Sequence, residues 1–238
     1  MFSFLKKNTT QNPLRVDLHS HLLPGLDDGV ADFDEAIRVI RQLHDLGYQK
    51  FITTPHIKSD RYHNTPEGIE KKWTELKTVL DQHHLPVQIE IAAEYYLDTW
   101  LINHVNDHKP VMTFGNNYFL FEMNYMSEPY QLNDFIFKLF TLGYKPVLAH
   151  PERYLFMTLQ KAEDLFSRGV LLQVNTMSFT DYYNKTVRRL AQQIVDNRWI
   201  SFLGSDCHSE KHIEPIADAM KTRHFKKALE LPLLNYQL

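Results

Sequence analysis

The sequence has a single cysteine, Cys207, and only eight glycines in 238 residues. One cysteine excludes an internal disulfide framework and is typical of proteins of a reducing compartment. No apolar run approaches the ~18–20 residues that a membrane-spanning helix needs. The first charges, at Lys6 and Lys7, follow a very short apolar stretch, which is the wrong order for a signal peptide. These absences predict a cytoplasmic globular protein without membrane insertion.

An excess of positive charge is also missing, because 26 Lys and Arg residues face 29 Asp and Glu residues, for a formal charge of −3. A chain without a basic surplus is poorly suited to bind nucleic acid over a broad face. Histidine, in contrast, is abundant, with 13 residues. The hydrophobic content of 43% is ordinary for a globular protein and sufficient for a sizeable core.

Seven short apolar runs of strand length alternate with helical patterns. The predicted strands are Arg15–Leu18, Lys50–Thr54, Val87–Ala92, Tyr118–Phe121, Lys145–Ala149, Val170–Val174 and Trp199–Leu203. The predicted helices are Asp32–Leu46, a helix opened by Thr65 and Pro66, Leu97–Val105, Leu132–Leu142, Leu159–Ser167, Val187–Val195 and Ile216–Leu229.

This alternation predicts parallel strands joined by right-handed crossovers. Either a closed or distorted β/α barrel or an open doubly wound sheet fits the pattern. No linker or repeat divides the chain, so we expect one domain over residues 15–238. A tail, Met1–Leu14, precedes this domain, and the sequence leaves open whether the tail is ordered or disordered.

Residues that can bind a metal ion follow six of the seven predicted strands. They are His19, His21, His56, Glu94, Glu122, His150, Asp206 and His208, with Asp27 and Asp28 as competitors for a ninth position in the loop after the first strand. Because the carboxyl ends of parallel barrel strands meet at one mouth, these side chains are expected to converge. Nitrogen and oxygen ligands without thiolate suit manganese, iron or catalytic zinc. Nine ligands imply two or three ions and a bridging carboxylate, an arrangement typical of phosphoryl-transfer hydrolysis.

Taken singly, each of these residues also has an ordinary interpretation. One His-x-His pair is a weak signal, and a lone glutamate after a strand can be a solvated loop residue. Cys207 lies between two candidate ligands on an extended segment, so its thiol is expected to point away from them and to pack in the interior. Most of the remaining histidines are interpreted as surface residues: His44, His63, His83, His84, His104, His108, His212 and His224.

The motifs, in their order, resemble those of the polymerase-and-histidinol-phosphatase (PHP) superfamily. More narrowly, they resemble the bacterial manganese-dependent protein tyrosine phosphatases encoded with capsule and exopolysaccharide genes. The resemblance covers the chain from Arg15 to the C-terminal helix. It is carried by Val16-Asp17-Leu18-His19-Ser20-His21, Leu23-Pro24-Gly25-Leu26-Asp27-Asp28-Gly29, Thr54-Pro55-His56, Ala93-Glu94, Phe121-Glu122-Met123, Ala149-His150-Pro151-Glu152-Arg153 and Ser205-Asp206-Cys207-His208.

The resemblance implies a distorted (β/α)7 TIM-like barrel of the PHP type with three divalent metal ions, manganese in first place and iron or zinc as alternatives. By motif position, the ligand sets are His19, His21, Glu94 and Asp206 for the first ion, Glu94, Glu122 and His150 for the second, and Asp28, His56 and His208 for the third. The same analogy selects Asp28 over Asp27. Arg153 is expected to bind the substrate phosphate, and Lys58 and Arg61 offer further contacts.

The implied activity is hydrolysis of a phosphomonoester, with the phosphotyrosine tail of a bacterial exopolysaccharide tyrosine kinase as substrate and partner. A cysteine-phosphoenzyme route is disfavoured because the sixth residue after Cys207 is Ile213, where a phosphate-cradling loop has arginine. The alternatives are a histidinol-phosphate or other small phosphoester phosphatase on the same fold and a non-catalytic phosphotyrosine-binding regulator. A nuclease is disfavoured by the acidic balance. The oligomeric state stays open.

Overall fold

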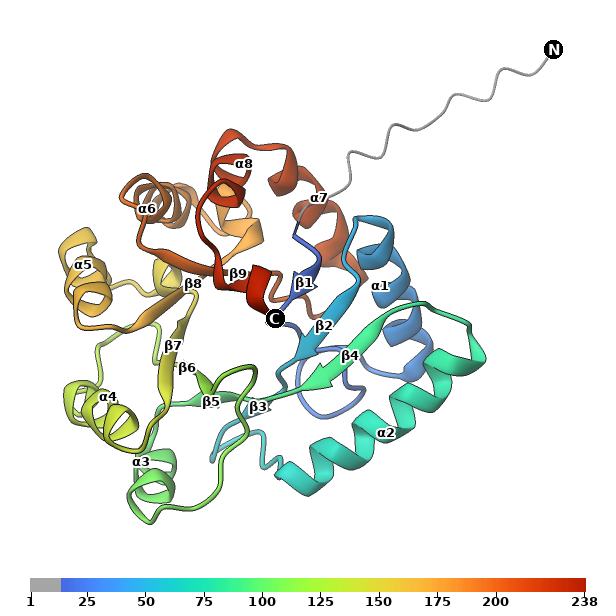
Figure 1. Cartoon of the computed structure of the whole chain (residues 1–238), viewed down its shortest axis with the longest axis horizontal. Helices are drawn as coiled ribbons and strands as arrows, with labels where there is room; N and C mark the ends of the chain where they lie inside the picture. The colour runs from blue at the N-terminus through green and yellow to red at the C-terminus, as the bar shows by residue number, and fades with distance from the viewer. Residues whose placement is uncertain (1–13) are drawn as a thin grey trace.

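Strands paired in parallel form two adjoining sheets in the computed structural model, which describes residues 14–238 (Figure 1). The first sheet has the order β1-β2-β4 and the second the order β3-β5-β6-β7-β8-β9. The strands are β1 (Val16–Asp17), β2 (Lys50–Thr53), β3 (His56–Ile57), β4 (Gln88–Ile91), β5 (Glu94–Tyr96), β6 (Tyr118–Glu122), β7 (Lys145–Ala149), β8 (Leu171–Asn175) and β9 (Ile200–Gly204).

Helices surround the strands on the outside of the ring seen in Figure 1. They are α1 (Phe33–Asp45), α2 (Pro66–Gln82), α3 (Thr99–Asn106), α4 (Leu132–Thr141), α5 (Leu159–Ser167), α6 (Lys185–Asp196), α7 (Ile213–Lys221) and α8 (Arg223–Leu229). Most begin at the capping residue that their sequence provides; Asp32, for example, accepts a hydrogen bond from the backbone N–H of Glu35 at the start of α1. No helix in the described part of the chain is long and apolar enough to cross a bilayer.

A break follows each of the second and third predicted strands, and a further short strand comes after each break. These two breaks separate the two sheets. β2 stops at Thr53 and the chain resumes as β3 after Pro55, while β4 stops at Ile91 and resumes as β5 at Glu94. Two of the candidate ligands, His56 and Glu94, are therefore first residues of short strands, and they face each other in the β3–β5 ladder. The sequence places both residues directly after predicted strands, and the structure adds a short strand that begins at each of them.

No ladder joins β9 to β1, and the seam between them is bridged at the carboxyl ends of the strands. Ser20 and Cys207 form an isolated parallel bridge. The backbone N–H of Asp206 donates to the carbonyl of His19 at 2.8 Å, and that of His21 donates to the carbonyl of Cys207 at 2.9 Å. The predicted α/β architecture with parallel strands is confirmed, and its strands form two sheets with a bridged seam between β9 and β1.

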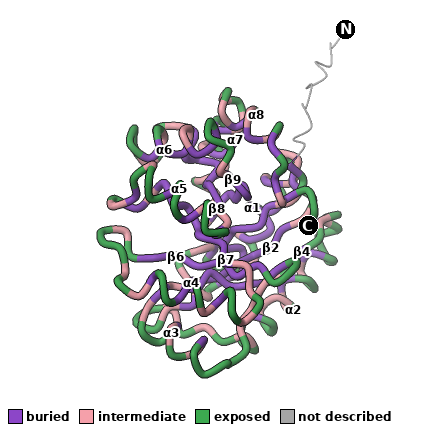
Figure 2. Tube along the Cα trace, turned by 60° about the vertical axis from the view of Figure 1, so that its left-hand side comes forward, coloured by how far each residue is buried: buried purple, intermediate pink, exposed green. Residues whose placement is uncertain are grey.

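Apolar side chains fill the interior of the ring up to the level of the candidate ligands, and Figure 2 shows the strands as its buried part. Leu18, Ile52, Ala92, Leu120, Val147, Ala149 and Phe202 belong to this inner cluster. A larger cluster lies between the strands and the helices. Leu14, predicted to belong to the tail, is fully buried in the larger cluster, whereas the rest of that predicted tail lies outside the described residues.

The last predicted helix, Ile216–Leu229, is two helices in the structure. Thr222 separates α7 from α8 with an extended backbone (φ −67°, ψ 153°), and its side chain accepts a hydrogen bond from the backbone N–H of Phe225. A threonine that caps a new helix in this way satisfies a backbone donor that an interrupted helix would leave unpaired. The apolar periodicity continues across the break and therefore did not reveal it.

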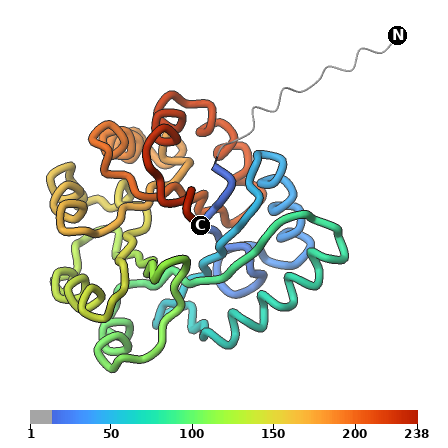
Figure 3. The backbone as a smooth tube through the Cα atoms, viewed as in Figure 1, coloured from blue at the N-terminus to red at the C-terminus, as the bar shows by residue number. Residues whose placement is uncertain are grey.

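After α8 the chain returns to the middle of the ring, as Figure 3 shows. Asn235, in the short helix η4 (Leu234–Gln237), is 2% exposed. Its side chain accepts from the backbone N–H of Leu203 at 3.0 Å and donates to the carbonyls of Leu203 at 2.8 Å and Val16 at 3.2 Å. One amide thus joins β9 to β1 at the end of the seam opposite to the candidate ligands.

We predict that Asn235→Ala lowers the free energy of unfolding by about 2–3 kcal/mol, because it leaves buried backbone groups of Leu203 without partners. The midpoint of urea unfolding measures the loss. Asn197→Ala is the matched control, since Asn197 is exposed and its amide donates to the carbonyl of Gln193 alone; it is expected to cost under about 0.5 kcal/mol. Equal losses in the two variants would contradict a role for Asn235 in the seam.

Candidate metal centre

The segment after β1 carries two imidazoles whose Nε2 atoms lie 3.4 Å apart, those of His19 and His21. Asp17 holds this segment against the one after β9, because its carboxylate accepts from the backbone N–H of Ser205 at 2.8 Å and from the Ser205 hydroxyl at 2.5 Å. Asp17 is fully buried, and burial raises its pKa to about 6. The pairing brings the candidate ligands of the first and last strands to one place.

Glu94 lies at the centre of the cluster and is fully buried. Its Oε2 atom is 3.2 Å from His19 Nε2, 3.4 Å from His21 Nε2 and 3.1 Å from His56 Nδ1. Its Oε1 atom is 3.1 Å from His150 Nε2. The two carboxylate oxygens therefore face different groups of imidazoles, which is the geometry that a bridging ligand requires.

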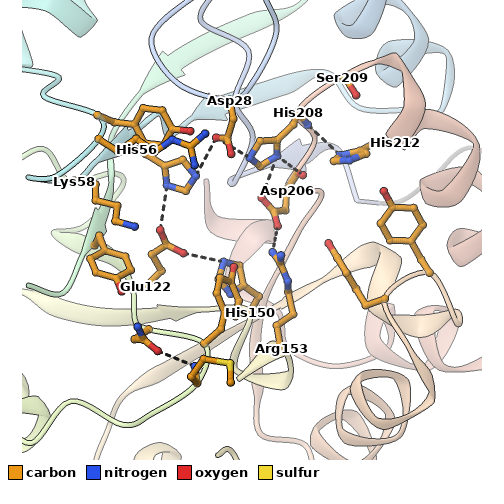
Figure 4. Close-up of a pocket in the computed structure, with 18 residues that line it drawn as sticks. Asp28, His56, Lys58, Glu122, His150, Arg153, Asp206, His208, Ser209 and His212 are labelled. Carbon is orange, nitrogen blue, oxygen red and sulfur yellow. Dashed lines mark hydrogen bonds and ion pairs between the residues drawn. The ribbon is translucent and has the colours of Figure 1, made fainter. Parts of the chain in front are cut away.

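Glu122 and His150 complete the side of the cluster at β6 and β7 (Figure 4). Glu122 Oε1 is 3.2 Å from His56 Nδ1, and Glu122 Oε2 is 3.9 Å from His150 Nε2. His150 has a left-handed backbone conformation (φ 35°), as does Asp206 (φ 53°) on the opposite side. This conformation costs a non-glycine residue free energy, which indicates that surrounding contacts hold both residues in place.

Asp206 presents its two oxygens to different partners. Oδ1 is 3.5 Å from His19 Nε2, 3.6 Å from His21 Nε2 and 3.5 Å from His208 Nδ1. Oδ2 accepts from the Arg153 guanidinium at 2.7 Å. One oxygen is thus directed at the imidazoles, while the other connects the cluster to the cation that was predicted to bind phosphate.

Asp27 and Asp28 differ in their hydrogen bonds. Asp27 is engaged within the protein: Oδ2 contacts His21 Nδ1 at 2.7 Å and accepts from the backbone N–H of His56 at 2.9 Å. Asp28 Oδ1 lies 3.5 Å from His56 Nε2 and 3.7 Å from His208 Nε2. Asp28 therefore faces the imidazoles of His56 and His208, whereas Asp27 orients the His21 ring from behind, as carboxylates commonly do for metal-binding histidines.

All nine predicted ligands are brought together, since each contacts another of the set within 4 Å. Burial opposes protonation of His19, but the charges of Glu94 and Asp206 outweigh it and raise the His19 pKa to about 9. Burial would raise the pKa values of Glu94 and Asp206, yet their imidazole partners hold both well below the usual range. Attraction between the imidazoles and the buried carboxylates thus offsets the cost of burial, a role that divalent cations fill in metal centres.

The residues fit divalent metal ions. Glu94 Oε2 and His56 Nδ1 are buried and lie 3.1 Å apart. Neither atom forms a hydrogen bond of acceptable geometry within residues 14–238. Ligand atoms within 4.8 Å of one another occur in four groups: His21, His56 and His208; His19, His21 and Glu94; Asp27, Asp28 and His56; and His56, Glu94 and Glu122. Several ions close together, with shared ligands, are consistent with these overlapping groups.

The cluster opens into a cavity of about 1030 Å³ whose wall carries cations and aromatic rings. The guanidinium of Arg153 lies 5.0 Å from the ring centre of Tyr125 and 4.5 Å from that of Tyr183. Arg61 also lines the cavity, exposed and 5.0 Å from the ring centre of Tyr62. Of the three predicted phosphate contacts, Arg153 is therefore fixed beside the cluster, whereas Lys58 and Arg61 line the cavity farther along its wall and Arg61 is exposed.

Three residues near the cluster escaped the sequence prediction. His212, interpreted as a surface residue, lines the cavity and accepts a hydrogen bond from the backbone N–H of His208 at 3.1 Å (Figure 4). Gln173 contacts His19 Nδ1 at 2.8 Å, and Asn175 donates to Asp206 Oδ2 at 2.6 Å. The available signal was the pair of amides in alternate positions of the otherwise apolar run Leu171–Asn175.

Cys207 behaves as predicted. Its thiol is fully buried within the larger apolar cluster, and burial raises its pKa above the ordinary range. A thiol of this kind is a packed side chain and not a nucleophile.

Parallel strands whose carboxyl ends carry a histidine and carboxylate cluster, open to a cavity, define an α/β protein with a candidate multi-metal centre. The chain belongs to the capsular polysaccharide synthesis CpsB/CapC family, whose model matches residues 15–230.

Individual relatives agree with this assignment. CapC of Staphylococcus aureus, provisionally named a tyrosine-protein phosphatase, is 27% identical over 229 residues, which are 94% of this chain and 90% of the relative. Tyrosine-protein phosphatase YwqE of Bacillus subtilis is 25% identical over 198 residues, 82% of this chain and 78% of the relative.

Solved structures share the fold. One structure comes from the work on YwqE of B. subtilis and CpsB of Streptococcus pneumoniae, which are described as metal-dependent tyrosine phosphatases. It has a TM-score of 0.80 at 23% identity and covers 91% of this chain and 90% of its own. The histidinol phosphate phosphatase of Lactococcus lactis, solved with zinc, L-histidinol and phosphate, has a TM-score of 0.53 at 11% identity and covers 90% of this chain and 93% of its own.

We predict that Glu94→Gln loses at least one metal ion per chain, because it removes the buried charge between two groups of imidazoles. Metal analysis of manganese-loaded protein measures this, and circular dichroism should show an intact fold. Glu90→Gln is the control: Glu90 lies in β4, is exposed, and forms an ion pair with Lys50. Equal metal content in the two variants would assign Glu94 no part in metal binding.

Proposed function

We propose that the protein is a metal-dependent phosphomonoester hydrolase that acts on protein phosphotyrosine. One observation carries the proposal: the nine candidate ligands meet beside the guanidinium of Arg153 at the wall of an open cavity. This places a phosphate-binding cation next to a multi-metal centre, in a chain whose relatives carry the name tyrosine-protein phosphatase.

The proposed centre holds up to three divalent ions. Nitrogen and oxygen donors suit manganese, iron or zinc, and manganese is the first choice because the motifs resemble those of manganese-dependent phosphatases. Glu94 would contribute to both the first and the second ion, because its two oxygens lie near His19 on one side and His150 on the other. The first ion would be held by His19, His21, Glu94 and Asp206, the second by Glu94, Glu122 and His150, and the third by Asp28, His56 and His208.

When bound, such ions supply an activated water and neutralise charge on the phosphate. Arg153 orients the phosphate. One of its N–H groups donates to Asp206 Oδ2, and the rings of Tyr125 and Tyr183 hold the guanidinium plane. Its other N–H groups have no hydrogen bond within the described residues, so they can donate to phosphate oxygens as charge develops there.

The lining of the cavity favours an aromatic phosphoester. Tyr62, Tyr96, Tyr125, Tyr182 and Tyr183 line it, and Lys58 and Arg61 add positive charge on the side of β3. A volume of about 1030 Å³ exceeds the need of a small phosphoester and leaves room for flanking peptide. The proposed partner is the phosphotyrosine tail of a bacterial tyrosine kinase, with the reaction in the cytoplasm.

Histidinol phosphate hydrolysis is the second candidate, because a histidinol phosphate phosphatase shares the fold. A non-catalytic phosphotyrosine-binding protein is the third. The complete ligand set speaks against the last, since pure binding needs no cluster of this size.

We predict that chelation abolishes hydrolysis of p-nitrophenyl phosphate and that manganese restores it, because the ligand cluster alone has no nucleophile activated for attack on phosphorus. Initial rates of stripped and reconstituted protein measure the effect. Undiminished turnover by thoroughly stripped protein would refute the proposed function.

We predict a higher kcat/KM for phosphotyrosine peptides than for phosphoserine peptides or histidinol phosphate under identical manganese. The aromatic lining contacts the phenyl ring, and a phenol with a pKa near ~10 leaves without full protonation. The comparison with histidinol phosphate is the informative one, because many phosphatases favour aryl esters over alkyl esters. A tenfold advantage for histidinol phosphate would replace the protein-phosphatase assignment by the small-molecule one.

A further inference from the structure

β8 corresponds to the one predicted strand that no candidate metal ligand follows, yet two of its polar side chains are directed at the cluster. Gln173 and Asn175 occupy alternate positions and therefore share a face of the strand. Leu171, on the same face, packs against the inner apolar cluster. Both amides are fully buried. Two buried amides at the level of the ligands, in a ring otherwise filled with apolar side chains, call for a physical explanation.

Gln173 holds a hydrogen on Nδ1 of His19. The backbone N–H of His150 donates to Gln173 Oε1 at 3.3 Å, and His19 Nδ1 lies 2.8 Å from the same atom. A backbone N–H can only donate, so the carbonyl oxygen of the amide must face it. His19 Nδ1 must then be a donor as well, so Nε2, which faces Glu94 and Asp206, is the nitrogen left to bind a metal ion.

Asn175 continues the same chain of hydrogen bonds to the other side of the cluster. Its Oδ1 accepts from Gln173 Nε2 at 2.9 Å, and its Nδ2 donates to Asp206 Oδ2 at 2.6 Å. The bonds therefore run in one direction, from His19 through Gln173 and Asn175 to Asp206. They end on a residue whose left-handed backbone conformation needs such support.

The backbone of β9 passes close to this hydrogen-bond relay, the chain of bonds from His19 through Gln173 and Asn175 to Asp206. A Cβ atom at Gly204 would lie 2.7 Å from His19 Cβ and 2.8 Å from Gln173 Nε2. Any side chain at this position would displace one of the two, so glycine is required for the close approach. Gly204 on β9 thus leaves the space that the amide of Gln173 on β8 occupies.

We propose that Gln173 and Asn175 are positioning residues for the metal centre: they set the metal-binding tautomer of His19, hold the turn at His150 and orient Asp206. The inference deepens the proposed function and rests on its metal centre. Partners behind the metal ligands commonly contribute 10–100-fold to metal affinity, and β8 supplies them here in place of a ligand.

The test is the apparent Kd for Mn²⁺ of the full chain, measured from the free-ion signal in electron paramagnetic resonance. Gln173→Leu and Asn175→Leu are each expected to weaken binding by roughly 10–100-fold. The Kd of the double variant should be little higher than that of the single variant with the weaker Mn²⁺ binding, because both residues belong to one chain of hydrogen bonds. Gln173→Glu keeps an oxygen that accepts from His19 and His150, so its Kd for Mn²⁺ should lie between those of wild type and Gln173→Leu. This variant replaces Gln173→Leu if the leucine form does not fold.

Asn235→Ala is the matched control, because Asn235 is also a buried amide with several hydrogen bonds but lies at the opposite end of the ring. It is expected to lower the unfolding midpoint and leave the Mn²⁺ affinity of the folded protein unchanged. A Kd within twofold of wild type for Gln173→Leu and Asn175→Leu, or an equal loss in Asn235→Ala, would overturn the inference. Wild-type protein that binds no Mn²⁺ would instead overturn the metal centre, and this inference with it.

Discussion

The burial of the Glu94 carboxylate is the constraint on which the rest of the structure depends. A charge without access to water is costly unless opposite charges surround it. Four imidazoles do so here, those of His19, His21, His56 and His150. They come from three parts of the ring: the segment after β1, the start of β3 and the end of β7. The charge can therefore be buried only when the parallel strands are assembled in the observed order.

Two features of the fold make this assembly possible. The interruption after Thr53 and after Ile91 lets His56 and Glu94 pair across a separate short ladder, so that they enter the cluster from the second sheet. The seam between β1 and β9 is held by backbone hydrogen bonds beside the ligands and by Asn235 at the far end. Apolar packing fills the ring between these two levels, which separates the polar cluster from the opposite end.

The sequence predicts the strands and the ligand cluster because both follow local rules. Parallel strands buried on two faces are near-continuous apolar runs, and the residues directly after them converge at one mouth. The break at Thr222 was not predictable in this way, because the apolar periodicity continues across it. His212 was assigned to the surface because its contact with the backbone of His208 depends on how the segment after β9 folds back.

The sequence by itself determined which residue types stand at the strand ends, and with them the class of ligands and the absence of thiolate. Only the tertiary structure decided how those residues divide their tasks. Asp27 and Asp28 are neighbours of the same type, and their different hydrogen bonds separate the residue that orients His21 from the one that faces His56 and His208. Gln173 and Asn175 likewise acquire their contacts across the ring. The physical reason is that hydrogen bonds between residues far apart in the chain are set by the packing of strands, which no local pattern encodes.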